Sequence, residues 1–313
     1  MDALTPEYRR LLELIPEGLI DMADIARTRA RVHQRIAASP ARPASPGVAI
    51  RDDVLPGDGT RPGPGIRLYT PASRPAPSGA LLFIHGGGFV MGELSQGDLH
   101  CMDIAARAGC VVAAVDYRLA PEHPYPAALE DCYAGLTFLA RQNGGPDVDP
   151  GRVAVAGVSA GGGLAAGLAL LSRDRGGPRI ALQMLEAPML DHRGVTPSSQ
   201  EIQHPKVWDG RANQLAWRAY LGGTDTPVSP YASPALAVDL GGLPPAYIAV
   251  SAKEMFRDEA LEYAQRLMAA AVPVEMHVYP DGFHGSTWGF PETEQSRRWR
   301  TDSIGALAAA VGH

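Results

Sequence analysis

Apolar residues along this chain fall into two patterns, short unbroken runs and longer stretches with helical spacing. The runs are rich in Val, Ile and Leu and end at turn-forming residues, as buried strands do. They predict strands at Val48–Val54, Ile66–Thr70, Leu81–His85, Val111–Tyr117, Val153–Val158, Ile180–Ala187, Ala246–Ser251 and Val274–Tyr279. Apolar positions three and four residues apart predict helices at Gly97–Ala108, Ala127–Gln142, Gly161–Arg173, Arg257–Ala271 and Glu292–Ala310. Beyond residue 79 strands and helices alternate, which favours a mostly parallel sheet covered by helices on both faces.

The amino-terminal part of the chain does not follow this alternation. Residues Pro6–Ala38 have helical spacing that is interrupted at Pro16, which predicts two helices ahead of the sheet. The proline-rich stretch Pro40–Pro46 then breaks the chain. We therefore expect an amino-terminal helical segment over residues 1–45 and a main domain over residues 46–313.

A second departure lies late in the chain. The segment Asp191–Leu243 is too long for a simple crossover between strands, and its middle, Arg211–Leu221, has helical spacing. We interpret residues from about 192 to about 222 as an insertion that forms, together with the amino-terminal helices, a cap over the site. Trp208 and Trp217 either line a substrate pocket beneath this cap or hold the cap in place.

Charge and composition exclude several classes of partner. The net charge is −6 without a block of Lys and Arg, whereas nucleic-acid binding needs clustered cations, so small or neutral substrates fit better. The arginines of the second predicted helix are expected to form a solvated face: Arg27, Arg29, Arg31 and Arg35. Met1–Arg10 is polar where a signal peptide would be apolar, and no apolar run reaches the length of a membrane span. These features predict a soluble, cytoplasmic protein.

No pattern in the chain predicts a metal site or a cofactor site. The three cysteines lack C-x-x-C spacing and are expected to be buried thiols: Cys101, Cys110 and Cys132. Histidines in predicted loops have no companion at metal-ligand spacing: His123, His192 and His204.

Gly157-Val158-Ser159-Ala160-Gly161 joins a predicted strand to a predicted helix. A serine in such a tight turn takes a strained backbone conformation, and its flanking positions must lack bulk, as Gly157 and Gly161 do. The turn presents the hydroxyl at the carboxyl end of the strand, beside the positive end of a helix. Ser159 is therefore a candidate nucleophile, although G-x-S-x-G by itself is a weak signal.

A glycine-rich stretch follows another predicted strand. Consecutive glycines at positions 86–88 are costly in entropy and make sense where backbone must approach a ligand closely. We predict that the amides of Gly87, Gly88 and Ala160 form an oxyanion hole. A phosphate-binding loop is excluded because no G-x-x-x-x-G-K-[ST] is present.

A serine nucleophile needs a general base with a pKa near neutrality, and histidine supplies one. His284 lies in a loop after the last predicted strand, with small neighbours that let it reach across the strand ends. His85, directly before the glycines, is expected to be structural. The chain order serine, acid, histidine points to Glu254 as the acid that orients the base, with Asp258 and Asp281 as alternatives.

These motifs carry a resemblance to a known family. His85-Gly86-Gly87-Gly88-Phe89, the serine motif at Gly157–Gly162 and the segment Tyr117–Ala127 resemble the bacterial branch of the hormone-sensitive lipase family of esterases. Further matches are Ser233-Pro234, Leu243-Pro244-Pro245 and Arg257-Asp258-Glu259. The resemblance implies an α/β-hydrolase fold, with an eight-stranded, mostly parallel sheet, flanking helices and a helical cap.

The activity that the resemblance implies is hydrolysis of short- to medium-acyl carboxylic esters through an acyl-enzyme, without a metal or other cofactor. Phe89 joins Trp208 and Trp217 as a candidate pocket residue, and the edge strand Val274–Tyr279 suggests a homodimer by analogy. Amides, carbamates or lactones are alternative substrates for the same residues. A non-catalytic small-molecule receptor is the alternative from another class, and the plant receptors of this fold lack the histidine found here at position 284.

The chain departs from the family pattern at three positions. Val158 replaces the usual Asp before the serine, and Glu254 begins Glu-Met-Phe where the family has Asp-Pro-Leu. Glu186 stands near a strand end where relatives are apolar, and we expect it to pair with a nearby base or to meet a polar substrate group. The charged residues Arg118, Glu122 and His123 are expected to form a buried network that braces the serine loop.

Overall fold

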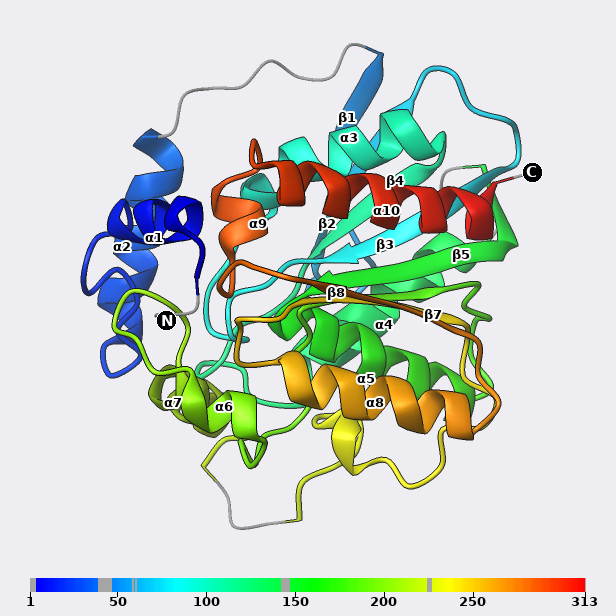
Figure 1. The fold of residues 1–313 in the computed structure, drawn as a ribbon. Coiled ribbons are helices and arrows are strands. Elements are labelled where there is room, and N and C mark those ends of the chain that lie inside the picture. The colour runs from blue at the N-terminus through cyan, green and yellow to red at the C-terminus, as the bar shows by residue number, and fades with distance from the viewer. Residues whose placement is uncertain are drawn as a thin grey trace.

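An eight-stranded sheet forms the centre of the molecule (Figure 1). The computed structural model describes residues 4–38, 47–57, 59, 61–141, 147–223 and 227–312. The strands, in the spatial order β1-β2-β4-β3-β5-β6-β7-β8, are β1 (Val48–Val54), β2 (Gly65–Pro71), β3 (Ser78–Ile84), β4 (Val111–Asp116), β5 (Val148–Val158), β6 (Gln183–Glu186), β7 (Ala246–Ser251) and β8 (Val274–Tyr279). The β1–β2 and β2–β4 pairs are antiparallel and the other five pairs are parallel, so the predicted fold class is confirmed.

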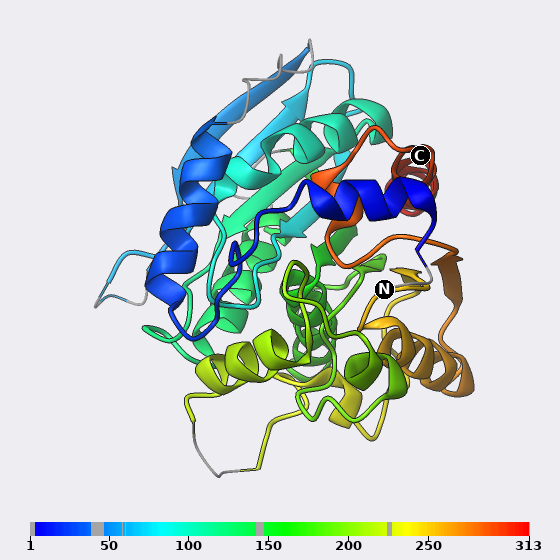
Figure 2. The same ribbon diagram turned by 60° about the vertical axis from the view of Figure 1, so that its left-hand side comes forward.

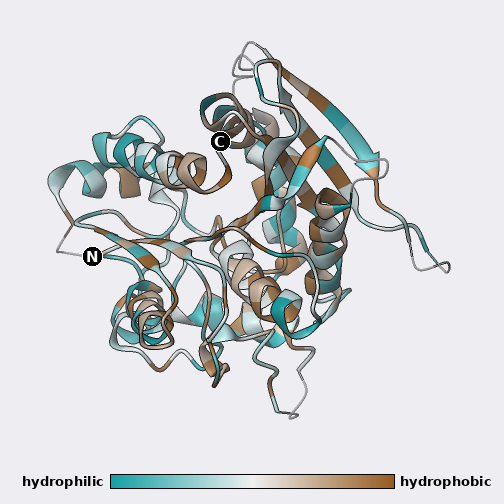
Figure 3. Cartoon of the chain, turned by 90° about the vertical axis from the view of Figure 1, so that its right-hand side faces the viewer, coloured by the Kyte–Doolittle hydropathy of each residue, from teal (hydrophilic) through white to brown (hydrophobic). Residues whose placement is uncertain are grey.

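Helices cover both faces of the sheet, as its unbroken apolar strands require. One face packs against α4 (Ala127–Ala140), α5 (Ala160–Asp174) and α8 (Arg257–Ala269), and the other against α3 (Asp98–Ala108) and α10 (Glu294–Val311). The central strand β3 is buried along its whole length. Figure 3 shows that apolar residues gather on the inward sides of these layers and hydrophilic residues on the outer helix surfaces. The three cysteines are buried and free, as predicted.

The observed β5 starts five residues before its predicted start at Val153, and β6 is shorter than predicted. The apolar run Ile180–Ala187 enters the ladder only over Gln183–Glu186. The strand ends there because Ala187 has a φ of 45°, a left-handed conformation that a strand cannot continue. Two short helices, α6 (Pro197–Glu201) and α9 (Ser286–Gly289), were not predicted, since they are too short to show a period.

The two predicted amino-terminal helices are present as α1 (Pro6–Glu13) and α2 (Ile25–Ala38). Figures 1 and 2 place them beyond the carboxyl ends of the central strands, at the same end of the molecule as α6 and α7 (Gly210–Tyr220). The expected proline-rich break, Pro40–Pro46, lies outside the described residues. Among the described helices, none combines the length and the apolar character needed to cross a membrane.

Candidate active site

Ser159 lies between β5 and α5, in a turn that its neighbours force into one shape. Its φ of 57° and ψ of −120° are strained for a residue with a side chain. A Cβ on Gly157 would lie 2.0 Å from the carbonyl oxygen of Gly161, and a Cβ on Gly161 would lie 2.1 Å from that of Ile84. Only glycine fits at either position. The Ser159 amide donates to the carbonyl of Glu186 at 2.8 Å, which fixes the turn to the next strand.

His284 connects the serine hydroxyl to a carboxylate. His284 Nε2 lies 2.9 Å from Ser159 Oγ, and His284 Nδ1 lies 2.7 Å from Glu254 Oε2. A carboxylate accepts hydrogen bonds only, so Nδ1 carries the proton and Nε2 is left to accept the serine proton. Glu254 is 2% exposed, and its other oxygen accepts the amide of Ser251 at 3.3 Å. These three side chains come from 30 to 125 residues apart in the sequence.

The two alternative acids are occupied elsewhere. Asp258, in the first turn of α8, accepts the Ser198 amide at 2.7 Å and pairs with Arg257 at 2.6 Å. Asp281 accepts the amide of Thr5 at 3.0 Å and that of Gly282 at 2.9 Å. Glu254 is the acid that the structure brings to the histidine.

The glycine loop, residues 86–91, runs beside the serine turn. Gly87 and Gly88 have φ values of 124° and 60°, and within the described part of the chain their amides have no hydrogen-bond partner. The turn is closed by the amides of Val90 and Met91, which both donate to the Gly87 carbonyl, at 3.1 and 3.0 Å. Ala160 is the first residue of α5, where helix amides lack an intrahelical acceptor.

His85 is structural, as expected. Its ring stacks on Tyr117 with centroids 4.2 Å apart, and its Nδ1–H donates to the Gly86 carbonyl at 2.8 Å. Burial lowers the pKa of His85 to about 4, so the ring is neutral near pH 7. The Tyr117 hydroxyl donates to the carbonyl of His85 at 3.0 Å, which holds the start of the glycine loop.

Aromatic residues pack against the outer side of the glycine loop. A Cβ on Gly88 would come within 2.2 Å of the Trp208 ring, so the indole lies directly on this glycine. Trp217 lies one layer further out: its ring centroid is 5.0 Å from that of Phe89, which also stacks on Tyr220 at 4.0 Å. Trp208 thus contacts the glycine loop directly, whereas Trp217 packs α7 against Phe89.

Glu186 is buried on the α10 side of the sheet. It is 5% exposed, and within the described residues no base pairs with it, so the expected pairing with a base is wrong. Burial raises the pKa of this carboxyl to about 7, although the polar groups of Trp299 and Ser303 act in the opposite direction. Glu186 is the register partner of Val158, so a carboxyl group lies one strand away from the position where the family has Asp.

Two further expectations need correction. Arg118 does form an ion pair with the buried Asp131 at 2.7 Å, but Glu122 and His123 are exposed, and Glu122 pairs with Arg29 instead. Exposure is favourable for these two side chains, because moving a charged group from water into the protein interior costs free energy. Arg29 was expected in a solvated face, yet its guanidinium is half-buried and bonded to main-chain carbonyls.

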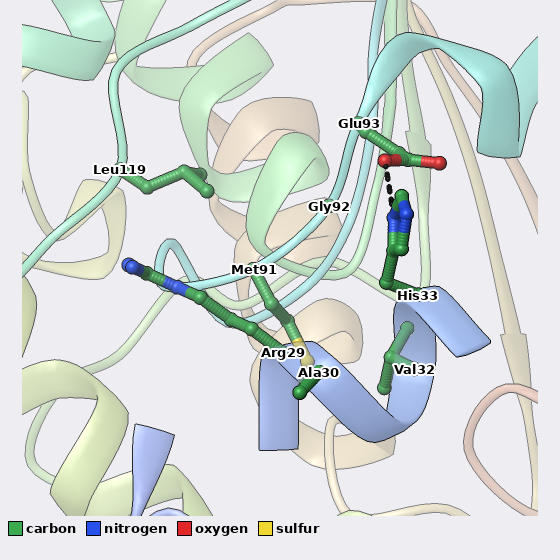
Figure 4. A pocket seen from close by; sticks show the side chains of 8 residues that line it. All are labelled: Arg29, Ala30, Val32, His33, Met91, Gly92, Glu93 and Leu119. Carbon is green, nitrogen blue, oxygen red and sulfur yellow. Dashed lines mark hydrogen bonds and ion pairs between the residues drawn. The ribbon is translucent and has the colours of Figure 1, made fainter. Parts of the chain in front are cut away.

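Two cavities lie near these elements. A small one of ≈ 10 Å³ is lined by Glu186, Glu254 and His284. The larger one, of ≈ 320 Å³, lies between α2 and residues 91–93 and is lined by no residue of the Ser159–His284–Glu254 set (Figure 4). No group of three metal-ligating side chains occurs in the ranges that the structure describes.

Comparison with known proteins assigns this architecture to a family. A family model described as alpha/beta hydrolase fold matches residues 81–287, more than half of the chain. The chain therefore belongs to the α/β-hydrolase fold family, and the predicted resemblance to its hormone-sensitive lipase-like branch is confirmed.

The individual relatives are ester hydrolases. Esterase LipI of Mycobacterium tuberculosis is 40% identical over 90% of this chain and 88% of its own length, and carboxylesterase NlhH of the same species is 34% identical over the same shares. Among solved structures, a bacterial heroin esterase superposes with a TM-score of 0.94 at 38% identity, covering 100% of this chain and 99% of that one. Esterase LipW of Mycobacterium marinum gives 0.90 at 40% identity, covering 99% and 96%. The class of activity common to fold and relatives is hydrolysis of carboxylic esters.

Proposed function

We propose that this chain is a serine carboxylesterase in which Ser159, His284 and Glu254 form the catalytic triad. The observation that carries the proposal is the continuous hydrogen-bond chain from Ser159 Oγ through the imidazole to the buried carboxylate, with links of 2.9 and 2.7 Å. Both links have the length of a nucleophile–base and a base–acid contact. A receptor that only binds its ligand does not need a serine hydroxyl hydrogen-bonded to a histidine and a buried carboxylate.

The reaction begins when Ser159 Oγ attacks the ester carbonyl and passes its proton to His284 Nε2. Glu254 stabilises the imidazolium that forms and holds the ring in the tautomer that leaves Nε2 free to accept. His284 then gives the proton to the departing alcohol, and an acyl-enzyme remains. Water repeats the sequence and releases the carboxylic acid.

The oxyanion of each tetrahedral intermediate would be held by the amides of Gly87, Gly88 and Ala160. Support comes from the two glycine amides that have no partner within the described residues and from the position of Ala160 at the start of a helix. Each such donor contributes roughly 10²–10³ in rate.

We further propose a short-acyl substrate, accommodated beneath a cap made of α1, α2, α6 and α7. Trp208 and Phe89 support this, because both aromatic rings lie close to the glycine loop, where an acyl chain would extend. Trp217 would shape the pocket through Phe89.

We also propose a cytoplasmic location and assembly as a homodimer. A cytoplasmic enzyme without a nucleic-acid partner fits the net charge of −6 and the lack of a cationic block. A homodimer would pair the β8 edges, since β8 is the last strand of the sheet and Val278 on it is 45% exposed. Light scattering on the purified chain tests the dimer.

The decisive experiment replaces the nucleophile. Ser159→Ala is expected to lower kcat for p-nitrophenyl acetate by about 10⁴ or more, because the acyl-enzyme cannot form. A fluorophosphonate should label the parent chain at Ser159 and leave the variant unlabelled. Turnover by Ser159→Ala within about tenfold of the parent would refute the assignment.

A further inference from the structure

Arg29 reaches from α2 to the back of the glycine loop. Its Nε donates to the carbonyl of Val90 at 2.5 Å, and its Nη2 donates to the carbonyl of Ala120 at 2.7 Å. The same guanidinium forms a two-point ion pair with Glu122, at 2.7 and 2.8 Å. One side chain therefore joins the amino-terminal helices to two loops of the main domain.

The carbonyl of Val90 belongs to the turn that carries Gly87 and Gly88. Since the amides of Val90 and Met91 both donate to the Gly87 carbonyl, a rotation of the Val90 peptide would turn the glycine amides as well. The Ala120 amide donates to the Phe89 carbonyl at 3.0 Å, so the two loops are already linked to each other. Arg29 bonds to one carbonyl in each loop and so holds the two loops in a fixed relative position.

Apolar packing of α2 comes from Ile25 and Val32, which lie against the main core. The cavity of ≈ 320 Å³ separates α2 from residues 91–93, and Arg29 lies at its edge (Figure 4). Figure 4 also shows the pair between His33 and Glu93, at 3.0 Å, but the His33 side chain is 68% exposed and such pairs contribute little. The Arg29 side chain is 29% exposed and bonds to a carboxylate and two carbonyls, which makes it the stronger connection.

We propose that Arg29 is a positioning residue for the oxyanion hole, which couples the seating of α2 to the orientation of the Gly87 and Gly88 amides. The inference rests on the proposed function, because it needs those amides to act on an oxyanion. Preorganised donors act mainly on the transition state, so the loss of Arg29 should lower kcat far more than it raises KM.

The test compares two arginines of the same helix. Arg29→Ala should lower kcat for p-nitrophenyl acetate by about tenfold to hundredfold with KM changed less than about threefold, because small misplacements of catalytic groups have effects of this size. Arg27→Ala is the control: Arg27 is exposed, and its guanidinium bonds to no described residue. Arg29→Lys keeps the charge but cannot reach both carbonyls, so its kcat should fall between those of the parent and Arg29→Ala.

A second readout separates positioning from a general structural role. A short trifluoromethyl ketone forms a tetrahedral adduct with a negatively charged oxygen, and its inhibition should weaken in parallel with kcat/KM in Arg29→Ala. Equal kcat in Arg29→Ala and Arg27→Ala within about twofold would overturn the proposal, and so would equal weakening of substrate and ketone binding. If Arg29→Ala does not fold, the kcat of Arg29→Lys is compared with that of Arg27→Ala instead, and equal values would again overturn the proposal. Turnover that survives in Ser159→Ala would instead refute the catalytic assignment. Failure of the Arg29 proposal and failure of the proposed function therefore give different results.

Discussion

The two sides of the candidate site are built in different ways. Ser159, Glu254 and His284 each follow a parallel strand, and main-chain hydrogen bonds along the ladder determine where those strands end. On the other side, α1, α2 and α7 are held mainly by side chains: Tyr8 meets Phe283 edge-on at 6.3 Å, and Arg29 bonds to two loops. The proposed catalytic residues are thus positioned by backbone geometry, and the proposed cap is held by side-chain contacts. Substitutions on the first side should remove activity, and those on the second should change its rate or selectivity.

The largest effect is expected at the acid. Glu254→Gln keeps the shape of the side chain but cannot stabilise the imidazolium, so kcat should fall by about 10³–10⁴. Asp258→Asn is the matched control, because Asp258 pairs with Arg257 rather than with the histidine. Its activity should stay within about tenfold of the parent. Steady-state kinetics on p-nitrophenyl acetate make the comparison, and the reverse ranking would move the acid to Asp258.

The strand-borne side of the site could be predicted from the sequence because each of its residues follows a recognisable strand. In a parallel sheet such positions converge at one edge, whatever their separation along the chain. The covering side could not be predicted in the same way. Arg29 looked solvated among its neighbouring arginines, although it lies between Ile25 and Val32 on the apolar stripe of α2, a signal that the sequence does carry. Two of its acceptors are main-chain carbonyls 61 and 91 residues away, and no side-chain pattern in the sequence marks these.

The next effect concerns selectivity on the covering side. Trp208→Ala removes the ring that lies on Gly88 and should raise the kcat/KM ratio of p-nitrophenyl hexanoate to acetate by about tenfold. Trp217→Ala is the control, since Trp217 touches Phe89 from behind and its loss should change stability more than chain-length preference. An acyl-chain series on both variants measures this. An unchanged ratio in Trp208→Ala would place the acyl chain elsewhere.

The smallest effect tests the buried carboxyl of Glu186, at the end of β6 beside α10. The pKa of Glu186 is raised to about 7 from an ordinary value of 4.5, so the folded state favours the protonated form. Below pH 4.5 the carboxyl is protonated in both the folded and the unfolded state, so it does not lower the unfolding free energy. The loss of unfolding free energy grows as pH rises from 4.5 to about 7 and is complete above that. Glu186→Gln removes this dependence and should therefore gain about 1–3 kcal/mol in unfolding free energy, relative to the parent, between pH 5 and pH 8. Urea denaturation at both pH values measures the gain, with Glu262→Gln, on the exposed side of α8, as the control. A gain that is equal at both pH values would mean that Glu186 is already ionised at pH 5, and that the environment beside α10 is more polar than its burial indicates.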